Sequence, residues 1–424
     1  MENFKLGDKL KIDTKKSTYT GILMPRSELA DDKHIVIKLD SGYNVGINKE
    51  KIKSITLIES QIPKEEFELK KAEFDKNKGK ISILATGGTI ASRIDYITGG
   101  VHSAFSADEL ISAVPELGQI ANVSGKQIFN KFSENINPDD WTLIARAVYD
   151  EIKKGADGIV VTHGTDTMGY TSAALSFMLN SPVPVVITGA QRSSDRGSSD
   201  AAVNLINAAV AAAKCKFGGI FVVVHGESSD SFDLIHPGTR VKKLHSSRRD
   251  AFKTVNDVPI GKVENGKIEY FENSSFYKFI SGQKNMELEL DAKLEKKVAL
   301  IKYFPGMSKD IIENLINLNY RGIIIEGTGL GHVNENLLET LKKAVDNKIP
   351  VFMTSQTMHG RVNMRVYATG RKLLNAGIIP CEDMLSETAL VKLMWVMGHT
   401  SDFEKVREMM LTNYAGEISE KTNI

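Results

Sequence analysis

The sequence predicts an α/β protein with two α/β domains built on parallel sheets, preceded by a small amino-terminal β-barrel. Three observations lead to this prediction. Apolar runs such as KISILAT and DGIVVTHG recur from Lys80 onward, each followed by enough chain for a helix, and this alternation is typical of parallel sheets. The same style of run resumes after about residue 295. The first sixty residues instead show short, evenly spaced segments separated by turns.

The amino-terminal module is expected to span residues 1–60. Its segments KLKID, YTGILM, HIVIKL, YNVGI and KSITLI are separated by Asp, Gly, Ser and Asn, as the short strands of a β-barrel would be. Residues 61–79 are dense in Lys and Glu with few apolar anchors, which is typical of a charged linker or an exposed helix. We therefore place a domain boundary at this linker.

The two α/β domains are expected at residues 80–290 and 295–424. The first contains VPVVITG and GGIFVVVHG, and the second contains KVALIKYFPG, RGIIIEGTG and IPVFMTSQ. These runs do not alternate strictly, so they fit strands that helices cover on both faces. Between the domains, residues 255–293 are polar and irregular.

Composition narrows the classes of function. The 424 residues carry a formal net charge of +1, which gives no overall attraction to nucleic acid or to an anionic membrane, so any RNA contact would be local. Cys215 and Cys381 are the two cysteines; they form no disulfide framework and no CxxC pair, which indicates a reducing compartment. No apolar run is long enough to cross a bilayer. We expect a cytoplasmic protein that binds no membrane.

Three polar motifs follow predicted strands or lie near them. ILATGGTIAS places Gly87 and Gly88 directly after a strand and beside the Thr89 hydroxyl, with Tyr96 on the Gly-rich loop that follows. Backbone N–H groups presented beside a hydroxyl suit acyl transfer. Taken alone, however, a Gly-rich turn is a weak signal.

The second motif, VVTHGTDTMGY, carries Thr165 and Asp166 at the turn into a helix that begins near Tyr170. Helix capping would explain one of these residues. It does not explain their combination with a second threonine turn. The third motif, TRVKKLHSSRRDAF, brings a run of lysines, and a lysine beside a carboxylate can be tuned to act as a base towards a hydroxyl.

Two other kinds of site are not favoured. GTGLGH has glycines at 327, 329 and 331, which is not the GxGxxG spacing of a dinucleotide site. The nine histidines show no HExxH or similar pair, so no catalytic metal is expected. His163 and His225 are expected to be structural hydrogen-bonding groups.

Taken together, ATGGTIAS, the Tyr96 loop, FSENI, THGTDTM, ITGAQR and VKKLHSS resemble the L-asparaginase and glutaminase family over residues 80–424. The resemblance implies two asparaginase-like domains and a threonine nucleophile at Thr89, assisted by Tyr96. It further implies a proton relay of Thr165, Asp166 and Lys243.

The adjacent Lys242 leaves the register of the lysine open, and Thr165 as the primary nucleophile also stays open. The resemblance assigns the α-amino and α-carboxylate groups of the substrate to Ser133 and Glu134. Glu134 departs from the glutamine that is common in secreted members, so the choice between asparagine and glutamine stays open.

The amino-terminal module, HSSRRDAF and the carboxyl-terminal segment CEDMLSETALVKLMWVMGHTSDFEKVREMMLTNYAGE resemble one branch, the D subunits of archaeal glutamyl-tRNA(Gln) amidotransferases. This implies that the chain releases ammonia from asparagine or glutamine for a separate E subunit that acts on glutamyl-tRNA(Gln). It also implies a homodimer within a heterotetramer, with no cofactor in this subunit because ATP and Mg are used by the partner. The alternatives are a free-standing L-asparaginase or glutaminase, and a non-catalytic RNA-binding scaffold, which would not need the threonines and the lysine.

Overall fold

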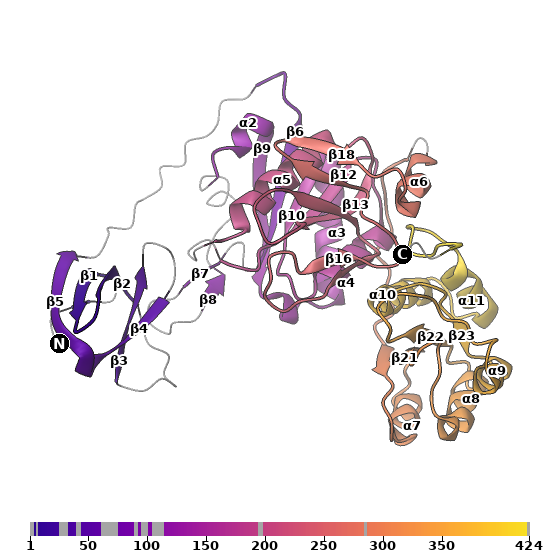
Figure 1. The fold of residues 1–424 in the computed structure, drawn as a ribbon. Coiled ribbons are helices and arrows are strands. Elements are labelled where there is room, and N and C mark those ends of the chain that lie inside the picture. Colours follow the sequence, from indigo (N-terminus) through magenta and orange to yellow (C-terminus); the bar gives the residue numbers. More distant parts are fainter. Residues whose placement is uncertain are drawn as a thin grey trace.

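The structure is a computed structural model, shown in Figure 1. It describes residues 4–5, 7–24, 33–39, 44–60, 75–88, 92–94, 101–103, 114–193, 198–283 and 286–421. Two of the predicted catalytic residues, Thr89 and Tyr96, lie outside these residues, as does most of the predicted linker at 61–79.

The amino-terminal module is a five-stranded antiparallel sheet in the order β4-β3-β2-β1-β5. Its buried core is formed by Leu10, Ile12, Ile37 and Ile47. In the described part of this module no pairing joins the edge strands β4 and β5, so the sheet is open and the predicted closed barrel is not confirmed. Alternation along a strand reveals which face is buried, but it carries no information on whether the two sheet edges meet. The strands are β1 (Lys9–Thr14), β2 (Thr18–Leu23), β3 (His34–Leu39), β4 (Asn44–Asn48) and β5 (Ile52–Glu59).

The middle of the chain forms an eight-stranded sheet in the order β18-β17-β14-β13-β12-β10-β6-β9. Five neighbouring strands are parallel, as the apolar runs predict. They are β6 (Lys80–Gly87), β9 (Asn122–Lys131), β10 (Gly158–Thr162), β12 (Pro184–Thr188) and β13 (Gly219–His225).

The other three strands run antiparallel, so the sheet is mixed and the prediction of a purely parallel sheet is wrong for this domain. They are β14 (Asp233–Pro237), β17 (Gly261–Glu264) and β18 (Lys267–Tyr270). Residues 226–232 between β13 and β14 are too few for the crossover that a parallel partner requires. The β17–β18 hairpin turns at Asn265 and Gly266, both with positive φ, as a two-residue type I′ turn requires.

Helices bury both faces of the parallel strands. Ile159 and Val161 of β10 point to the cluster under α3 and α4, and Val160 points to the cluster under α2 and α5. This period-two division of one apolar run explains why the run shows no polar face. The helices are α2 (Leu117–Ile120), α3 (Pro138–Lys153), α4 (Met168–Met178) and α5 (Ala201–Lys214). The start of α3 is fixed by a capping box between Asn137 and Asp140 with proline at the first position.

Short elements complete this domain. Two of them, β15 and β16, form the antiparallel pair that carries the lysine motif. The set comprises β7 (Ser92–Ile94), β8 (Val101–Ser103), the 3-10 turn Ser133–Asn135, β11 (Leu179–Asn180), β15 (Val241–Lys243), β16 (Phe252–Thr254), α6 (Ser275–Ser281) and β19 (Glu289–Leu290).

The carboxyl-terminal domain is a four-stranded parallel sheet in the order β20-β21-β22-β23, which agrees with the predicted parallel α/β domain. Helices α7, α8 and α9 cover one face. On the other face, α10 packs against β20 and β21 and also against α4, so one apolar cluster continues across both domains. The elements are β20 (Val298–Lys302), α7 (Asp310–Asn317), β21 (Gly322–Gly327), α8 (Leu338–Asp346), β22 (Val351–Ser355), α9 (Ala368–Asn375), β23 (Ile379–Pro380), α10 (Ser386–Met397) and α11 (Phe403–Leu411).

The strand order of the large sheet marks a place for a site. From β6 the chain moves to β9 on one side, and it then returns to β10 on the other side. In open α/β sheets, ligands bind outside the carboxyl ends of the strands at such a reversal. The TGGT turn follows β6 and the HGTDT turn follows β10. The two threonine motifs therefore flank the reversal.

Candidate active site

Glycines let four loops meet at the carboxyl ends of these strands. A Cβ atom on Gly88, whose φ is +82°, would lie 2.4 Å from the Gly164 nitrogen. A Cβ atom on Gly164 would lie 2.7 Å from the Cβ of Ser133. A Cβ atom on Gly189 would lie 2.4 Å from the His163 carbonyl oxygen. No real side chain tolerates such distances, so these glycines are needed for the loops after β6, β9, β10 and β12 to touch.

Lys243 reaches into this meeting point from β15. Its ammonium group donates one hydrogen bond of 2.8 Å to Thr165 Oγ1 and another of 2.8 Å to Asp166 Oδ1. The Lys243 side chain is 14% exposed and Thr165 is buried, whereas the Asp166 side chain is 67% exposed. Because the Asp166 side chain is largely exposed, its ion pair with Lys243 contributes little stability. The contact instead orients the Lys243 side chain.

The geometry separates the two adjacent lysines. Lys242 forms an ion pair of 2.7 Å with Glu387 of α10, while Lys243 faces Thr165. Successive side chains of a strand point to opposite sides, so one strand cannot present both lysines to Thr165. The sequence left this register open, and the contacts favour Lys243.

The strand that carries Lys243 is braced by the carboxyl-terminal domain. Arg240 is buried and forms an ion pair of 3.1 Å with Asp383, and it donates to the Gly416 carbonyl at 2.7 Å and to Ser419 Oγ at 2.6 Å. Thr388 of α10 adds a hydrogen bond of 2.8 Å to the Thr239 carbonyl. These contacts hold the start of the lysine motif against α10 and against loops of the carboxyl-terminal domain.

The predicted substrate-binding residues lie in the short 3-10 turn after β9. Ser133 is buried against Gly164, and Glu134 beside it is exposed. The hydroxyl of Thr167 donates to the Ser133 carbonyl at 2.7 Å. This bond ties the Ser133 turn to the loop that carries Thr165 and Asp166.

His163 orients the peptide just before Thr165. Its Nδ1 lies 2.6 Å from the Gly164 carbonyl oxygen, so Nδ1 carries the proton and donates. Its Nε2 then accepts from the Thr171 hydroxyl at 2.9 Å, and Thr171 accepts from the Trp141 indole at 3.1 Å. The three groups fix one tautomer of a neutral imidazole. His163 is therefore a structural hydrogen-bonding group, as expected from the sequence.

Acidification is expected to destabilise the protein through His163. Burial lowers the pKa of His163 from 6.5 to about 4, so below pH 6.5 the unfolded chain binds a proton that the folded chain does not. The contribution of His163 to the free energy of unfolding should fall by about 1.4 kcal/mol for each pH unit between about 6.5 and 4, and buried His236, whose pKa is lowered to about 3, adds to this slope. Denaturant unfolding at pH 7, 6 and 5 measures this slope.

The matched variants for this experiment are His163→Gln and His245→Gln. Glutamine at 163 removes one of two fully buried imidazoles whose pKa burial lowers, the other being His236, so the slope should become shallower in His163→Gln. His245→Gln is the control for the same replacement at an exposed position. An unchanged slope in His163→Gln would contradict this assignment.

The structure thus brings together Thr165, Asp166, Lys243 and Ser133, with Glu134 on the same turn. The sequence did not point to Thr167, Gly189 or Arg240. For Thr167 the sequence offers one weak signal, which is its position two residues after Thr165. Gly189 and Arg240 act through contacts between segments far apart in the chain, which no local pattern reveals.

Two absences concern only the described part of the chain. No group of three or more His, Cys, Asp or Glu residues there is arranged to hold a metal ion. No helix among the described residues is both long and apolar enough to cross a membrane.

Comparison with family models gives three matches along the chain. The model described as "Asparaginase, N-terminal" matches residues 80–276, and "Glutaminase/Asparaginase C-terminal domain" matches residues 297–410. The model described as "GatD N-terminal domain" matches residues 4–58. The matches follow the three sheets of the fold.

Similar solved structures carry the asparaginase name. The thermostable L-asparaginase from Thermococcus kodakarensis is 37% identical with a TM-score of 0.71, and the similarity covers 81% of this chain and all of that one. L-asparaginase I from Vibrio cholerae is 28% identical with a TM-score of 0.70, covering 81% of this chain and 99% of that one.

Similar curated proteins carry the name of an amidotransferase component. The D subunit of glutamyl-tRNA(Gln) amidotransferase from Pyrococcus furiosus is 53% identical over 99% of this chain and 96% of its own length. The protein of the same name from Methanococcus maripaludis is 51% identical over 99% of both chains. The chain therefore belongs to the asparaginase and glutaminase family, in the branch formed by the D subunits of glutamyl-tRNA(Gln) amidotransferases.

Proposed function

We propose that this chain is the ammonia-generating amidohydrolase subunit of a glutamyl-tRNA(Gln) amidotransferase, and that it takes ammonia from the side-chain amide of asparagine or glutamine. The observation that carries the proposal is the contact of Lys243 with Thr165 and Asp166 at the strand reversal, where Gly88 touches Gly164. Thr89 directly follows Gly88 in the chain. A scaffold that only binds RNA would need none of these polar groups.

In the proposed reaction, Thr89 Oγ attacks the amide carbon of the substrate while its proton passes to Thr165 Oγ1, and the hydroxyl proton of Thr165 passes to the leaving nitrogen. The developing oxyanion is stabilised by backbone N–H groups of the Gly-rich turns, each worth about 10²- to 10³-fold. The C–N bond breaks, the nitrogen takes up a proton, and ammonia leaves an acyl-threonine ester. Water then hydrolyses the ester to release aspartate or glutamate and restore Thr89.

Thr165 and Lys243 serve this sequence as a proton relay. The Lys243 ammonium donates to Thr165 Oγ1, which leaves the Thr165 hydroxyl proton free to point towards a reacting oxygen or water. Asp166 orients Lys243 from the solvent side. Acid–base assistance of this kind is worth about 10²- to 10⁴-fold in rate.

The remaining predicted residues complete the substrate site. Tyr96 assists the nucleophile, and Ser133 and Glu134 hold the α-carboxylate and α-amino groups. The close packing of Ser133 on Gly164 supports this assignment, because it brings the Ser133 turn to the loop of Thr165. The exposed carboxylate of Glu134 suits an ammonium group.

The proposal extends to the assembly. The D-subunit relatives support a partner E subunit, which would activate the glutamate on glutamyl-tRNA(Gln) with ATP and Mg and then accept the ammonia. No cofactor is assigned to this chain. A homodimer within a heterotetramer is the proposed assembly. The compartment is the cytoplasm.

A free-standing L-asparaginase or glutaminase is the second candidate. The likeness to the Thermococcus kodakarensis L-asparaginase favours it for the chemistry. The amino-terminal sheet favours the amidotransferase role, because residues 4–58 match the GatD N-terminal model and a self-sufficient hydrolase does not need that sheet.

The test measures ammonia release from asparagine and from glutamine by the purified chain, first alone and then with the E subunit, ATP, Mg and glutamyl-tRNA(Gln). We expect strong stimulation by the complete mixture, and we expect Thr89→Ala to remove the activity in both settings. A Thr89→Ser variant, which keeps a hydroxyl, should retain part of it.

Equal and fast hydrolysis with and without the partner would favour the free-standing enzyme. Activity that survives intact in Thr89→Ala would contradict the assignment of the nucleophile. No ammonia in any mixture would contradict the whole proposal.

A further inference from the structure

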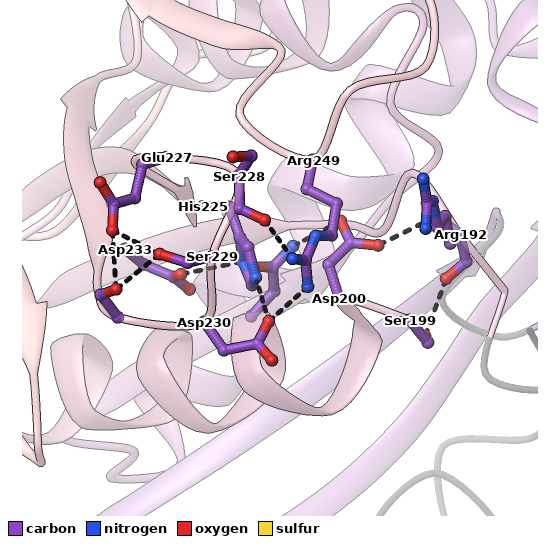
Figure 2. Close-up of polar contacts among 12 residues, drawn as sticks. Arg192, Ser199, Asp200, His225, Glu227, Ser228, Ser229, Asp230, Asp233 and Arg249 are labelled. Atoms are coloured by element: carbon purple, nitrogen blue, oxygen red, sulfur yellow. Dashed lines mark hydrogen bonds and ion pairs between the residues drawn. The ribbon is translucent and has the colours of Figure 1, made fainter. Parts of the chain in front are cut away.

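His225 lies at the carboxyl end of β13 and is fully buried, and the polar groups around it are charged or strongly polar. Figure 2 shows it between Asp230 and Asp233, with Arg249 on the far side of Asp230. None of these residues belongs to the relay of Thr165, Asp166 and Lys243. A buried histidine in such a position calls for a role that the mechanism above does not supply.

Both ring nitrogens of His225 face acceptors. Nδ1 lies 2.5 Å from Asn204 Oδ1 and 3.1 Å from Asp233 Oδ1, and Nε2 lies 3.1 Å from Asp230 Oδ1. The oxygen of the Asn204 amide faces His225, because the nitrogen of that amide donates to Gly189 and Asp200. A neutral ring would turn a lone pair towards one of the carboxylates. When both nitrogens carry protons, as in an imidazolium, Nδ1 donates to Asn204 and Nε2 donates to Asp230, and the positive ring lies 3.1 Å from the buried Asp233 carboxyl group.

Asn204 connects this group to the active site. Its Nδ2 donates to the Gly189 carbonyl at 2.7 Å and to Asp200 Oδ2 at 3.2 Å. A Cβ atom on Gly189 would lie 2.4 Å from the His163 carbonyl oxygen and 3.3 Å from Thr165 Cγ2. The Gly189 main chain therefore packs against the Thr165 side chain, and the hydrogen bond from Asn204 fixes the position of that main chain.

Asp200 secures the rest of the same loop. Its carboxylate accepts from the backbone N–H groups of Gln191 and Arg192, both at 2.9 Å. Asp200 is buried, and its charge faces His225 from the start of α5. The loop after β12 is thus held by Asp200 and Asn204, of which Asn204 contacts His225 directly and Asp200 faces it with its charge.

On its other side, the group reaches the segment that carries the lysine. Asp230 is shared between His225 and Arg249, and Arg249 also donates to the Ser228 carbonyl. Arg249 lies in the loop between β15, which ends at Lys243, and β16. That loop is closed by a hydrogen bond of 2.7 Å from Leu244 N to the Ala251 carbonyl.

We propose that His225 is a positioning residue that, as an imidazolium, connects the Gly189 main chain, which packs against Thr165, to the segment that carries Lys243. It does so through Asn204 and Gly189 on one side and through Asp230 and Arg249 on the other. This inference rests on the proposed function, because it concerns the same relay. Its effect is on the alignment of the relay, so the turnover number should suffer and the affinity for substrate should not.

Three carboxyl groups, those of Asp200, Asp230 and Asp233, face His225, and burial raises the pKa of Asp233 itself. Of the nearby cations, Arg249 contacts the same Asp230 oxygen as His225, and Lys253 contacts the Gly226 carbonyl and Asp250. Burial alone would lower the pKa of His225, but its contacts with Asp233 and Asp230 overcome this and raise the pKa above 6.5. The alignment should therefore hold at neutral pH and should be lost as the pH rises through the raised pKa of His225.

The test compares His225→Gln with His236→Gln. His236 is another fully buried histidine, on the neighbouring strand β14, and its Nδ1 contacts the Thr254 hydroxyl of β16 instead of Asn204 or Asp230. For His225→Gln we expect kcat for ammonia release to fall by about 10- to 100-fold, the scale of a small misalignment, with KM within about 3-fold. His236→Gln should stay near the wild type in both constants.

Two further readouts separate positioning from general destabilisation. The imidazole resonances of His225 should titrate above 6.5, with a midpoint that coincides with an alkaline loss of kcat in the wild type. Amide exchange at Gln191 and Arg192 should be faster in His225→Gln than in His236→Gln. A His225 that titrates below 6.5, or wild-type kcat in His225→Gln, would overturn the inference.

Failure of the proposed function would look different. If the wild-type chain releases no ammonia in any mixture, the proposed function fails, and the inference is still decided by the titration and by amide exchange. Raised titration with faster exchange at Gln191 would support the tie to Gly189, and unchanged exchange would overturn it.

Discussion

Replacing Lys243 by methionine is expected to lower kcat for ammonia release by about 10²- to 10⁴-fold, which is the value of acid–base assistance. The ammonium group is the donor that contacts both Thr165 and Asp166 at 2.8 Å. Methionine keeps most of the length and volume of the side chain but cannot carry a proton. Lys243 contacts the other relay residues, Thr165 and Asp166, rather than the predicted substrate-binding turn. The KM should therefore change little. Steady-state kinetics with saturating glutamine or asparagine measures both constants.

Lys242→Met is the matched control. The substitution is chemically identical and one residue away, but Lys242 pairs with Glu387 instead of Thr165. Its kcat should stay within about 3-fold of the wild type, since a partly exposed ion pair contributes little. Equal losses in the two variants would contradict the register, and a larger loss in Lys242→Met would reassign the relay to that residue.

Replacing Lys392 by methionine is expected to cost about 3–5 kcal/mol of stability, because it leaves a buried carboxylate without a counter-charge. The Lys392 and Glu417 side chains are both 0% exposed, and their charged atoms lie 2.5 Å apart. Lys392 also donates to the carbonyls of Met410 at 2.8 Å and Thr412 at 2.6 Å. Its loss should release the segment after α11, which also anchors Arg240. Denaturant unfolding followed by fluorescence of Trp395 in a Trp141→Phe background measures the loss.

Lys342→Met provides the comparison at an exposed ion pair. Lys342 lies 2.7 Å from Asp346, with the two side chains 57% and 60% exposed, so its loss should cost under about 1 kcal/mol. The double variant Lys392→Met/Glu417→Gln removes the unpaired charge and should recover part of the loss. Equal costs for Lys392→Met and Lys342→Met would show that burial of the pair has no consequence.

The α/β fold could be predicted because its strands are buried on both faces. Runs such as KISILAT and GGIFVVVHG are mostly apolar and coincide with β6 and β13. The threonine motifs could also be found from sequence, because they sit directly after such strands. Hydrophobic burial is a local property of the chain, so it leaves a local pattern.

The pairing of strands leaves a weaker pattern in the sequence than burial does. The antiparallel strands β14, β17 and β18 lie in or near a polar stretch, where alternation is short and masked by turn residues. The Asn265–Gly266 pair is a hairpin signal that the polar composition of residues 255–293 obscured. The open edge of the amino-terminal sheet likewise depends on which strands meet, which their own sequences do not encode.

The residues that support the site could not be predicted from the sequence for a different reason. Arg240 reads as one more charge in a basic run, yet it is buried against Asp383, far along the chain. His225 reads as the end of a strand, yet it joins segments from α5, β14 and the loop after β15. Such roles arise from tertiary contacts, so only the folded chain reveals them.

The most direct test of the account is to locate the nucleophile by covalent labelling, since a diazoketone loses N₂ and alkylates the oxygen that attacks it. The complete mixture with E subunit and glutamyl-tRNA(Gln) is treated with a diazoketone analogue of glutamine, digested, and analysed by mass spectrometry, with Lys243→Met treated in parallel. We predict an adduct on Thr89 that forms far more slowly in Lys243→Met. An adduct on Thr165 alone would contradict the assignment of nucleophile and relay.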